Sequence, residues 1–554
     1  MQPPISRREA LAALAAAPVL AAPEPPAVDP AILKRHDESV ASLLERQVTD
    51  PASRWCGTLA DGYGIYHPGS AGGILNACAC AYLHPGSKHH GDNSIVERMR
   101  LAARRLERAQ SPDGNIDLLT TNFNSPPDTG FVVWGVAQAA SIAMKYGHTE
   151  LAAMLRPFLE KAAAGMAKGG VHTPNHRWVV CSALSQVHAL WPNPACLKRI
   201  DQWLAEGVDI DSDGQYTERS TLVYNTVCNR AFLLMAAKLN RPELLDPVRR
   251  NLNAMLYLTH PGHEVVTEIS RRQDLNQRGA MGGYWLPLAF LAVRDGNGQF
   301  AALSREFHAR HASLGDIMDL PELSRPLPAP AALPENYEKV FPAIQVARIR
   351  RGLTSATMLL GANSHFFTLR RGEAVINAVR FASAFFGKAQ FVPAQAEKRG
   401  ESYYFTQSLE ADYVQPLDPL RKVAAGEWGS TRGARRRSEI CRLTQSAVVT
   451  ETPRGFRLRL QASGTNNVPL AVEISLREGG KLEGCEAAPG VENVWLLRAG
   501  QASYRAGSDV IRFGPGRAEH SYTEVRGAEP KLPGLGVYLT GYTPFDHTIE
   551  FEAG

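Results

Sequence analysis

The sequence lacks the short motifs that define several large enzyme classes. It contains no phosphate-binding Gly-x-x-x-x-Gly-Lys loop, no Gly-x-Gly-x-x-Gly dinucleotide turn, no Gly-x-Ser-x-Gly elbow and no His-Glu-x-x-His pair. These absences exclude the common nucleotide-binding, esterase and zinc-protease interpretations. The composition is that of a soluble globular protein, with 44% hydrophobic and 21% charged residues.

Cysteine is sparse, and its spacing matches no zinc motif. The eight cysteines are Cys56, Cys78, Cys80, Cys181, Cys196, Cys228, Cys441 and Cys485. Most lie in apolar, helix-like segments, so buried free thiols are expected. His84, His89 and His90 share a loop but have neither a carboxylate cage nor ordered spacing. No metal or cofactor is expected, although a structural divalent cation remains open.

Neither sign of charge dominates, because the net charge is +5 over 554 residues. The one dense basic run is Arg432-Gly433-Ala434-Arg435-Arg436-Arg437, and it has no interleaved aromatic residue. It is therefore expected to form a solvated turn, and no nucleic-acid partner is expected. The oligomeric state cannot be read from the sequence.

The N-terminus has the features of an export signal. Arg7 and Arg8 precede a short alanine- and leucine-rich segment that ends near Ala22, and a proline-rich spacer follows at 23–30. Twin arginines before such a segment are typical of a twin-arginine signal peptide. The segment is too short for a membrane span. Residues 1–22 are therefore predicted to be removed, leaving a periplasmic or secreted protein without stable membrane insertion.

The first half of the mature chain has helical periodicity. Apolar residues recur at spacings of three and four from 32–48 to 284–293, in about ten segments separated by short links. The intervening segments are 94–109, 129–146, 150–167, 177–190, 196–205, 220–239 and 242–256. No strand pattern separates them, so stacked antiparallel hairpins are expected. Residues 31–318 are predicted to form an incomplete α/α toroid.

The periodicity changes after a proline-rich linker at 319–336. Apolar residues alternate with polar ones in many short segments separated by glycine-rich turns. The clearest segments are 366–370, 447–451, 456–460, 470–476, 494–497, 510–513 and 548–551. Residues 337–554 are therefore predicted to form an antiparallel β-sandwich, and the fold class is α followed by β.

Two segments carry a concentration of polar residues at predicted helix starts. The first is His172-Thr173-Pro174-Asn175-His176-Arg177-Trp178, and the second runs from Asp213-Gly214 through Glu218 to Tyr224-Asn225. Proline and the Asp-Gly turn are typical of such starts. The side chains offer no obvious nucleophile, but they suit proton abstraction next to a carboxylate.

Cleavage of a uronic-acid polysaccharide by β-elimination needs those groups. Donors or a cation must neutralise the uronate, a base must take the C5 proton, and an acid must protonate the leaving oxygen. A tyrosine, whose pKa is ordinarily about 10, needs a nearby cation to act as a base. The candidates are Asn175, His176, Tyr216 and Tyr224, with Arg219 or Arg271 as the cation.

The order of helical toroid, proline linker and β-sandwich resembles polysaccharide lyases of the heparinase II/III and chondroitin AC type. In that class an Asn or His at a helix start precedes an Asp-Gly-aromatic-x-Glu turn and a catalytic Tyr. Asn175-His176 resembles the first element, and Asp213 to Glu218 with Tyr224 resembles the second. The resemblance implies that Asn175 or His176 neutralises the uronate and that Tyr224 is base and acid. The family often has His beside this Tyr, whereas this chain has Asn225, so His176 remains an alternative base.

Further residues are candidates for binding an acidic polysaccharide or oligosaccharide. Arg271 and Arg272 could grip carboxylates bidentately, although a surface ion-pair network is an equal alternative. Asn124 could bind sugar hydroxyls, and Trp55 offers an aromatic face for a sugar ring. The remaining candidates are Arg177, Glu218 and Arg219. Capping and packing roles are the structural alternatives for the whole set.

Two other functions stay open. A glycoside hydrolase on the same toroid would use paired carboxylates, such as Asp128 with Asp213 or Glu218. A non-catalytic carbohydrate-binding protein would bind through the β-domain and aromatic loops. The sequence indicates neither which polysaccharide is bound nor whether cleavage is endo or exo.

Overall fold

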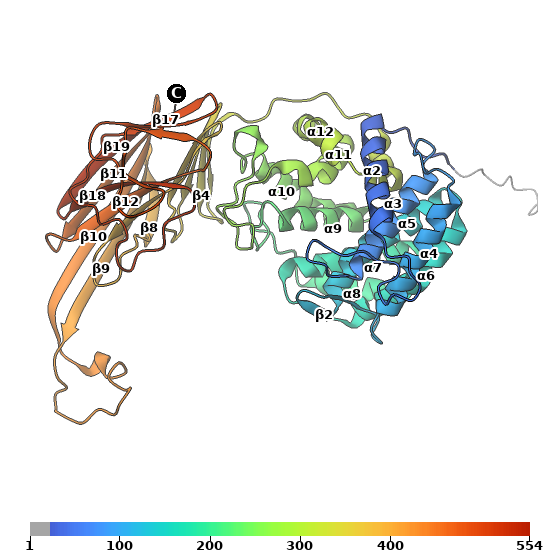
Figure 1. The fold of residues 1–554 in the computed structure, drawn as a ribbon, viewed down its shortest axis with the longest axis horizontal. Coiled ribbons are helices and arrows are strands. Elements are labelled where there is room, and N and C mark those ends of the chain that lie inside the picture. Colours follow the sequence, from blue (N-terminus) through green and yellow to red (C-terminus); the bar gives the residue numbers. More distant parts are fainter. Residues whose placement is uncertain (1–22, 554) are drawn as a thin grey trace, which may run out of the picture. The chain divides into compact units, whose positions relative to one another are not determined.

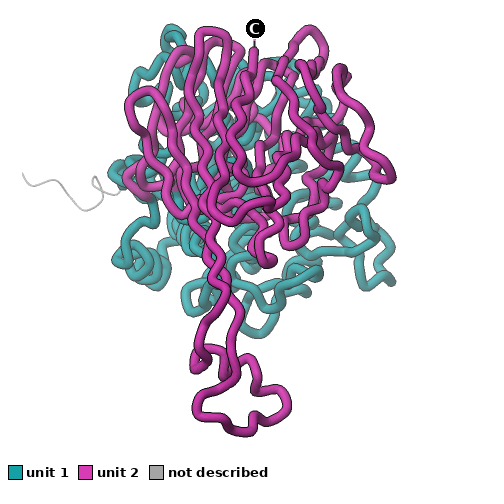
Figure 2. The backbone as a smooth tube through the Cα atoms, turned by 90° about the vertical axis from the view of Figure 1, so that its left-hand side faces the viewer, with its two compact units in different colours: residues 1–210, 216–252, 281–332 teal, residues 211–215, 253–280, 333–554 magenta. Residues whose placement is uncertain are grey.

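The computed structural model describes residues 23–553, so the predicted signal peptide at 1–22 lies outside the described residues. The chain forms two compact units (Figures 1 and 2). The helical unit comprises the residues up to 210, then 216–252 and 281–332. The sheet unit comprises 211–215, 253–280 and 333–554. The predicted fold class, α followed by antiparallel β, is confirmed.

Helices occupy most of the first half of the chain. The α-helices are α2 (Pro30–Arg46), α3 (Gly69–Leu83), α4 (Asn93–Ala109), α5 (Pro126–Lys145), α6 (Thr149–Lys168), α7 (Pro174–Leu190), α8 (Pro194–Ala205), α9 (Tyr224–Leu239), α10 (Asp246–Met255), α11 (Trp285–Asp295), α12 (Gly298–His311) and α13 (Leu314–Asp319). Short 3₁₀ turns are η1 (Pro242–Leu245), η2 (Pro261–His263), η3 (Met281–Tyr284), η4 (Pro321–Ser324) and η5 (Arg432–Ala434).

The helices of the helical unit alternate between buried and half-exposed. Helices α3, α5, α7, α9 and α11 are buried over most of their length, whereas α2, α4 and α8 bury only one face. Helix α5 packs against α3, α6 and α7, and α7 packs against α9. Helix α12 returns to α2, where Arg35 donates to the carbonyls of Ala309 and Ala312. Buried helices surrounded by half-exposed ones are the arrangement expected of an α/α toroid.

The sequence pattern did not identify helix α3, which is rich in glycine and alanine. Its small residues allow a close approach to α5, since a Cβ added to Gly72 would lie 2.7 Å from Val132. A second difference concerns the segment before α5. It forms a two-stranded hairpin of β1 (Ile116–Leu118) and β2 (Asn122–Ser125), so the expectation that no strands interrupt the helices was wrong.

The sheet unit is a sandwich of two large sheets. The eight-stranded sheet contains, in order, β13 (Lys481–Glu483), β16 (Ala502–Ala506), β17 (Asp509–Gly514), β19 (Phe545–Glu552), β11 (Gly455–Gly464), β10 (Arg437–Thr452), β9 (Ser402–Val414) and β8 (Gln395–Arg399). The nine-stranded sheet contains β14 (Glu486–Ala487), β15 (Val494–Leu496), β18 (Leu535–Tyr542), β12 (Pro469–Leu476), β7 (Ala374–Ser383), β6 (Phe367–Arg371), β5 (Thr354–Leu359), β4 (Val346–Arg351) and β3 (Asn336–Phe341).

Aromatic rings fill the space between the two sheets. Phe367 of β6 contacts Phe456 of β11 and Phe551 of β19, with ring centroids 5.6 and 5.8 Å apart. All of these side chains are buried, as expected for residues on the inner faces of a sandwich. The pairing is antiparallel except between β15 and β18, which run parallel.

The outer face of β4 to β6 is covered by the irregular segment 253–280 of the same unit. Arg348 on β4 is fully buried and donates to the carbonyl of Thr259 at 2.9 Å. Arg370 on β6 forms ion pairs with Glu264 and Glu268. Buried arginines on this face therefore hold the segment against the sheet.

Candidate functional site

The first predicted segment begins helix α7. Pro174 is the first residue of the helix, where its missing N–H and fixed φ cost nothing. Asn175 and His176 follow in the first turn, and both side chains are buried. Asn175 is fully buried, whereas His172 in the preceding loop is exposed.

Asn175 is joined to Glu218 across 43 residues of sequence. Its Nδ2 donates to Glu218 Oε2 at 2.7 Å and to Thr173 Oγ1 at 3.2 Å. Because a carboxylate can only accept, the Asn175 atom that faces Glu218 is the amide nitrogen. Asn175 Oδ1 is left without a hydrogen bond within residues 23–553. The contact brings the two predicted segments together.

Aromatic residues surround His176. Its ring lies edge-on to His172 and Phe131, with centroids 4.7 and 6.2 Å away, and Trp134 packs on Phe131 at 5.4 Å. Phe131 and Trp134 come from the first turns of α5, so the starts of α5 and α7 lie together. The sequence reasoning missed both residues, although aromatics three apart after a proline pair were a usable indication.

The tyrosines of the second segment have different environments. Tyr216 is fully buried, donates to Asn229 Oδ1 at 3.0 Å and stacks on Phe232. Burial raises its pKa well above the ordinary value, which favours a packing role over proton transfer. Tyr224 is half-buried and is the first residue of α9. Its N–H donates to Ser220 Oγ at 3.0 Å, after a left-handed turn at Arg219 with φ 49°.

We call Asn175, His176, Glu218 and Tyr224 the helix-start cluster, a name that groups residues of the two predicted segments, which the Asn175–Glu218 hydrogen bond joins. Arg177 is directed to protein carboxylates, with Nη2 3.0 Å from Asp209 and Nη1 3.3 Å from Glu206. Asp209 also accepts from Trp178 Nε1 at 2.7 Å. Arg177 therefore ties α7 to the loop that leads to Glu218, which favours a positioning role over substrate binding.

The other predicted binding residues have local structural partners. Asn124 of β2 binds Asp117 of β1 and, in the loop before β1, Ser111 and Asp113, at distances of 2.6 to 2.9 Å. Trp55 stacks on Tyr66 with centroids 5.3 Å apart. Arg271, which is exposed, and Arg272, which is half-buried, belong to the sheet unit rather than the helical unit.

The carboxylates considered for hydrolysis are engaged in local structure. Asp128 in the first turn of α5 accepts from Asn122 at 2.8 Å and from Ser125 at 2.5 Å. Asp213 accepts from the N–H of Ile344 at 3.0 Å. These hydrogen bonds give Asp128 and Asp213 structural roles in a helix cap and a loop. The structure therefore favours the glycoside-hydrolase alternative less.

A second buried group of charges lies in the sheet unit. This ion-pair cluster contains His260, Glu264, Glu268, Arg370 and Arg477. Burial would raise the pKa of Glu264, but Arg477 and Arg370 outweigh it and lower the pKa to about 2. Burial lowers the pKa of His260 to about 3, so its imidazole is neutral at pH 7. The cluster is internally balanced, which favours a structural role.

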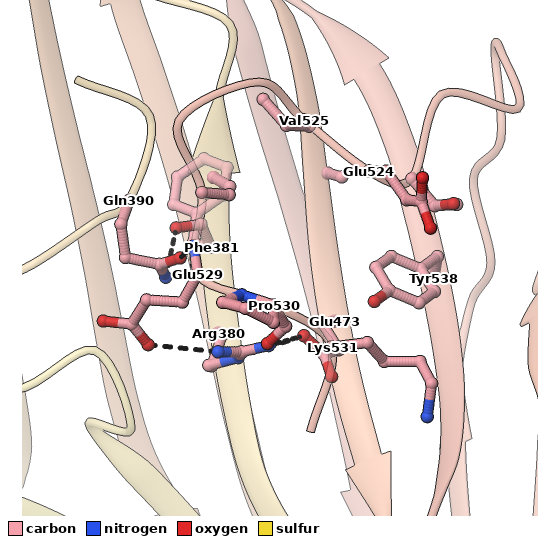
Figure 3. A pocket seen from close by; sticks show the side chains of 14 residues that line it. Arg380, Phe381, Gln390, Glu473, Glu524, Val525, Glu529, Pro530, Lys531 and Tyr538 are labelled. Carbon is pink, nitrogen blue, oxygen red and sulfur yellow. Dashed lines mark hydrogen bonds and ion pairs between the residues drawn. The ribbon is translucent and has the colours of Figure 1, made fainter. Parts of the chain in front are cut away.

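Figure 3 shows a further pocket of the sheet unit, with a volume of about 340 Å³. Arg380 donates to Glu473 at 3.0 Å, to Glu529 at 3.0 Å and to the carbonyl of Pro530 at 2.7 Å. The guanidinium is nearly fully buried and has carboxylate partners on both sides. These bonds hold the segment before β18 against β7 and β12.

Within residues 23–553, no group of three or more His, Cys, Asp or Glu side chains gathers as metal ligands would. No helix of that part has both the length and the apolar character needed to cross a bilayer. The cysteines are free thiols, and six of the eight are buried.

Comparisons with protein-family models and with curated proteins find no match for this sequence. Solved structures do match. The chondroitin AC lyase of Streptomyces coelicolor A3, solved with chondroitin sulphate, is 13% identical with a TM-score of 0.53, covering 95% of this chain and 80% of that one. A Paenibacillus xanthan lyase is 11% identical with a TM-score of 0.57, covering 95% of this chain and 57% of that one, so this chain spans little more than half of it. The chain therefore has the fold of these polysaccharide lyases, as the sequence resemblance implied.

Proposed function

We propose that this protein cleaves a uronic-acid-containing polysaccharide by β-elimination. The observation that carries the proposal is the hydrogen bond between Asn175 and Glu218, which joins the start of α7 to the loop that leads to Tyr224. These residue types suit elimination and occur in a chain with the fold of two polysaccharide lyases. One of those lyases was solved with chondroitin sulphate, an acidic polysaccharide.

Tyr224 is the proposed base and acid. It is the more accessible phenol of the two, and its place at the first position of α9 puts it near the positive end of the helix dipole. Tyr224 would take the C5 proton, the C4–O bond would break, and the phenol would return the proton to the leaving oxygen. Arg219 is the proposed cation.

Neutralisation of the uronate is assigned to Asn175 or His176. Asn175 Nδ2 would donate to the uronate in place of Thr173 Oγ1, because that 3.2 Å hydrogen bond is the longer of its two contacts. Full burial of Asn175 requires the side chains that cover it to move when substrate binds. His176 lies next to it and is the alternative donor. Glu218 is a positioning residue, because it holds the amide of Asn175.

We further propose that the protein acts outside the cytoplasm, after removal of residues 1–22. The support is the twin-arginine pattern at Arg7 and Arg8. Mass spectrometry of the protein from a periplasmic fraction tests this, and an intact N-terminus in the cytoplasmic fraction would contradict it.

Ultraviolet absorbance of a 4,5-unsaturated uronate tests the reaction. The full chain would be incubated with chondroitin sulphate, hyaluronate and xanthan, with uncharged dextran as the control. We expect absorbance to rise with at least one acidic polymer and not with dextran. New reducing ends without that absorbance would show hydrolysis and would contradict elimination.

A further inference from the structure

One part of the sheet unit extends away from its two sheets. Strands β9 and β10 pair along nearly their whole length, from Ser402–Thr450 to Val414–Arg437. Neighbouring strands accompany only their proximal parts, since β8 pairs with β9 up to Thr406 and β11 pairs with β10 from Leu443. Beyond those points the two strands form a ribbon of their own, which Figure 2 shows projecting to a loop. We call residues 407–442 the arm and 415–436 its tip.

Apolar packing supports the base of the arm, where Leu409, Ala411 and Cys441 lie in a small cluster with Phe385 and Val468. Isolated two-stranded ribbons are otherwise marginally stable in water. Charged side chains support the rest of the arm. Arg437 pairs with Glu410 and Asp412, and Arg442 pairs with Glu410 at 3.0 Å. Arg432 reaches back from the tip to Asp412 at 3.2 Å. The acidic residues of the ribbon thus orient arginines near the tip.

Positive charge is concentrated at this end of the arm. The tip, residues 415–436, contains five basic and two acidic residues, a net charge of +3 within a chain whose total is +5. Arg421, Lys422 and Arg436 are exposed, and none makes an ion pair within residues 23–553. Unpaired exposed cations grouped at one tip create a local positive potential that attracts a polyanion.

An aromatic side chain accompanies these cations. Trp428 is 54% exposed, and Arg435 lies over its ring at 5.1 Å. The sequence run at 432–437 has no aromatic within it, but the fold brings this indole beside it. One face of the indole meets the guanidinium, and the C–H face of a sugar ring can pack on exposed indole surface. Leu420 is the other large apolar side chain exposed at the tip, and Tyr413 and Ile440 are exposed farther down the arm.

We propose that the tip of the arm is a second binding site for acidic polysaccharide, separate from the helix-start cluster. Arg421, Lys422 and Arg436 attract the carboxylate or sulfate groups, and Trp428 packs against a sugar ring. The choice of a polysaccharide over other polyanions rests on the proposed function. The arm would raise the local concentration of a long polymer, and it would leave the turnover of short oligosaccharides unchanged.

The test compares two triple variants that lose the same charge. One carries Arg421→Ala, Lys422→Ala and Arg436→Ala at the tip. The control carries Lys34→Ala, Arg104→Ala and Arg294→Ala, which replace exposed residues of the helical unit. Binding to immobilised chondroitin sulphate would be measured over a range of salt concentrations. We expect about tenfold weaker binding for the tip variant at low salt, less than twofold for the control, and convergence of all proteins at high salt.

Several results would overturn the proposal. Equal losses in both variants would show an effect of net charge alone, and unchanged binding in the tip variant would remove the site. Failure of the unaltered protein to bind chondroitin sulphate would also contradict a binding site on the arm. Arm-dependent binding to phosphatidylglycerol vesicles, without binding to chondroitin sulphate, would assign the arm to a membrane surface.

The outcome is separable from that of the proposed function. If the unaltered protein makes no unsaturated product but the two variants still differ in binding, the arm site stands and elimination fails. If product forms and binding does not depend on the arm, elimination stands and the arm site fails. Trp428→Ala adds an independent check, because we expect it to weaken binding to chondroitin sulphate at high salt, where the charge contribution is screened.

Discussion

Asn175, His176 and Glu218 of the helix-start cluster are buried, and so are His260, Glu268 and Arg370 of the ion-pair cluster, but the partners of their carboxylates differ. In the sheet unit, Glu264 lies between Arg370 and Arg477, and all three side chains are less than one-fifth exposed. In the helical unit, Glu218 accepts from the neutral amide of Asn175, and Tyr224 stays half-exposed nearby in the chain. A dense group of charges stabilises structure when its members neutralise one another. A group with an accessible phenol and a neutral amide donor is better suited to bind and react.

The largest expected effect separates the two tyrosines. Tyr224→Phe should lower kcat by about 1,000-fold, because it removes the proposed base and acid. Tyr216→Phe removes the same atom from a buried packing residue, so kcat should stay near that of the unaltered protein. Its free energy of unfolding should fall by about 1 kcal/mol through loss of the bond to Asn229. Steady-state kinetics measures kcat, and denaturant unfolding measures the free energy of unfolding of each variant. Equal losses of kcat in the two variants would contradict the different roles assigned to Tyr216 and Tyr224.

Substitutions in the ion-pair cluster should change the free energy of unfolding. Glu264→Gln should lower the free energy of unfolding at pH 7 by about 3 kcal/mol, because Arg370 and Arg477 lose their shared carboxylate. The folded-state pKa of Glu264 is lowered to about 2, so its contribution is present above the unfolded value of about 4.5 and is lost as pH falls toward 2. The variant and the unaltered protein should therefore converge in denaturant titrations at low pH.

The matched control is Glu550→Gln, which removes a carboxylate from an exposed pair with Arg457. Its unfolding should be unchanged within error, because exposed pairs contribute little. A Glu550→Gln effect as large as that of Glu264→Gln would contradict the structural role assigned to the ion-pair cluster.

The next largest effect on kcat is expected from substitution of Asn175. Asn175→Ala should lower kcat by about 100-fold, as expected for the loss of one group that stabilises developing charge. Glu218→Gln keeps an acceptor for the Asn175 amide and should lower kcat less, with KM nearly unchanged. A larger loss for Glu218→Gln than for Asn175→Ala would show that the carboxylate itself acts on substrate.

A smaller effect concerns pH. Burial lowers the pKa of His260 to about 3, whereas an unfolded histidine has a pKa of about 6.5. The neutral buried ring therefore contributes stability that is complete above pH 6.5 and is lost as pH falls toward 3. The loss should reach about 1.4 kcal/mol per pH unit in the steep part of that range. His260→Gln should flatten this slope, and the same change at the exposed His172 should leave it intact.

Local periodicity predicted most of the elements but not all of them. The helix expected at 94–109 is found at Asn93–Ala109, and the strand expected at 470–476 is found at Pro469–Leu476. Helix α3 was not predicted because its glycines allow close packing against α5. Packing against a helix that is distant in sequence does not require a regular spacing of apolar residues. The segment 253–280 has no period either, because buried ion pairs with β6 hold it in place.

The sequence by itself determined the change from period three-to-four to period two, the proline linker and the residue types at the starts of α7 and α9. Those features depend on neighbours within a few residues of one another. Only the tertiary structure decided that Asn175 meets Glu218, that Arg177 meets Asp209, and that Tyr216 is buried while Tyr224 is half-exposed. The physical reason is that such pairings depend on how helices pack, and a hydrogen bond spanning 43 residues leaves no mark on the local pattern.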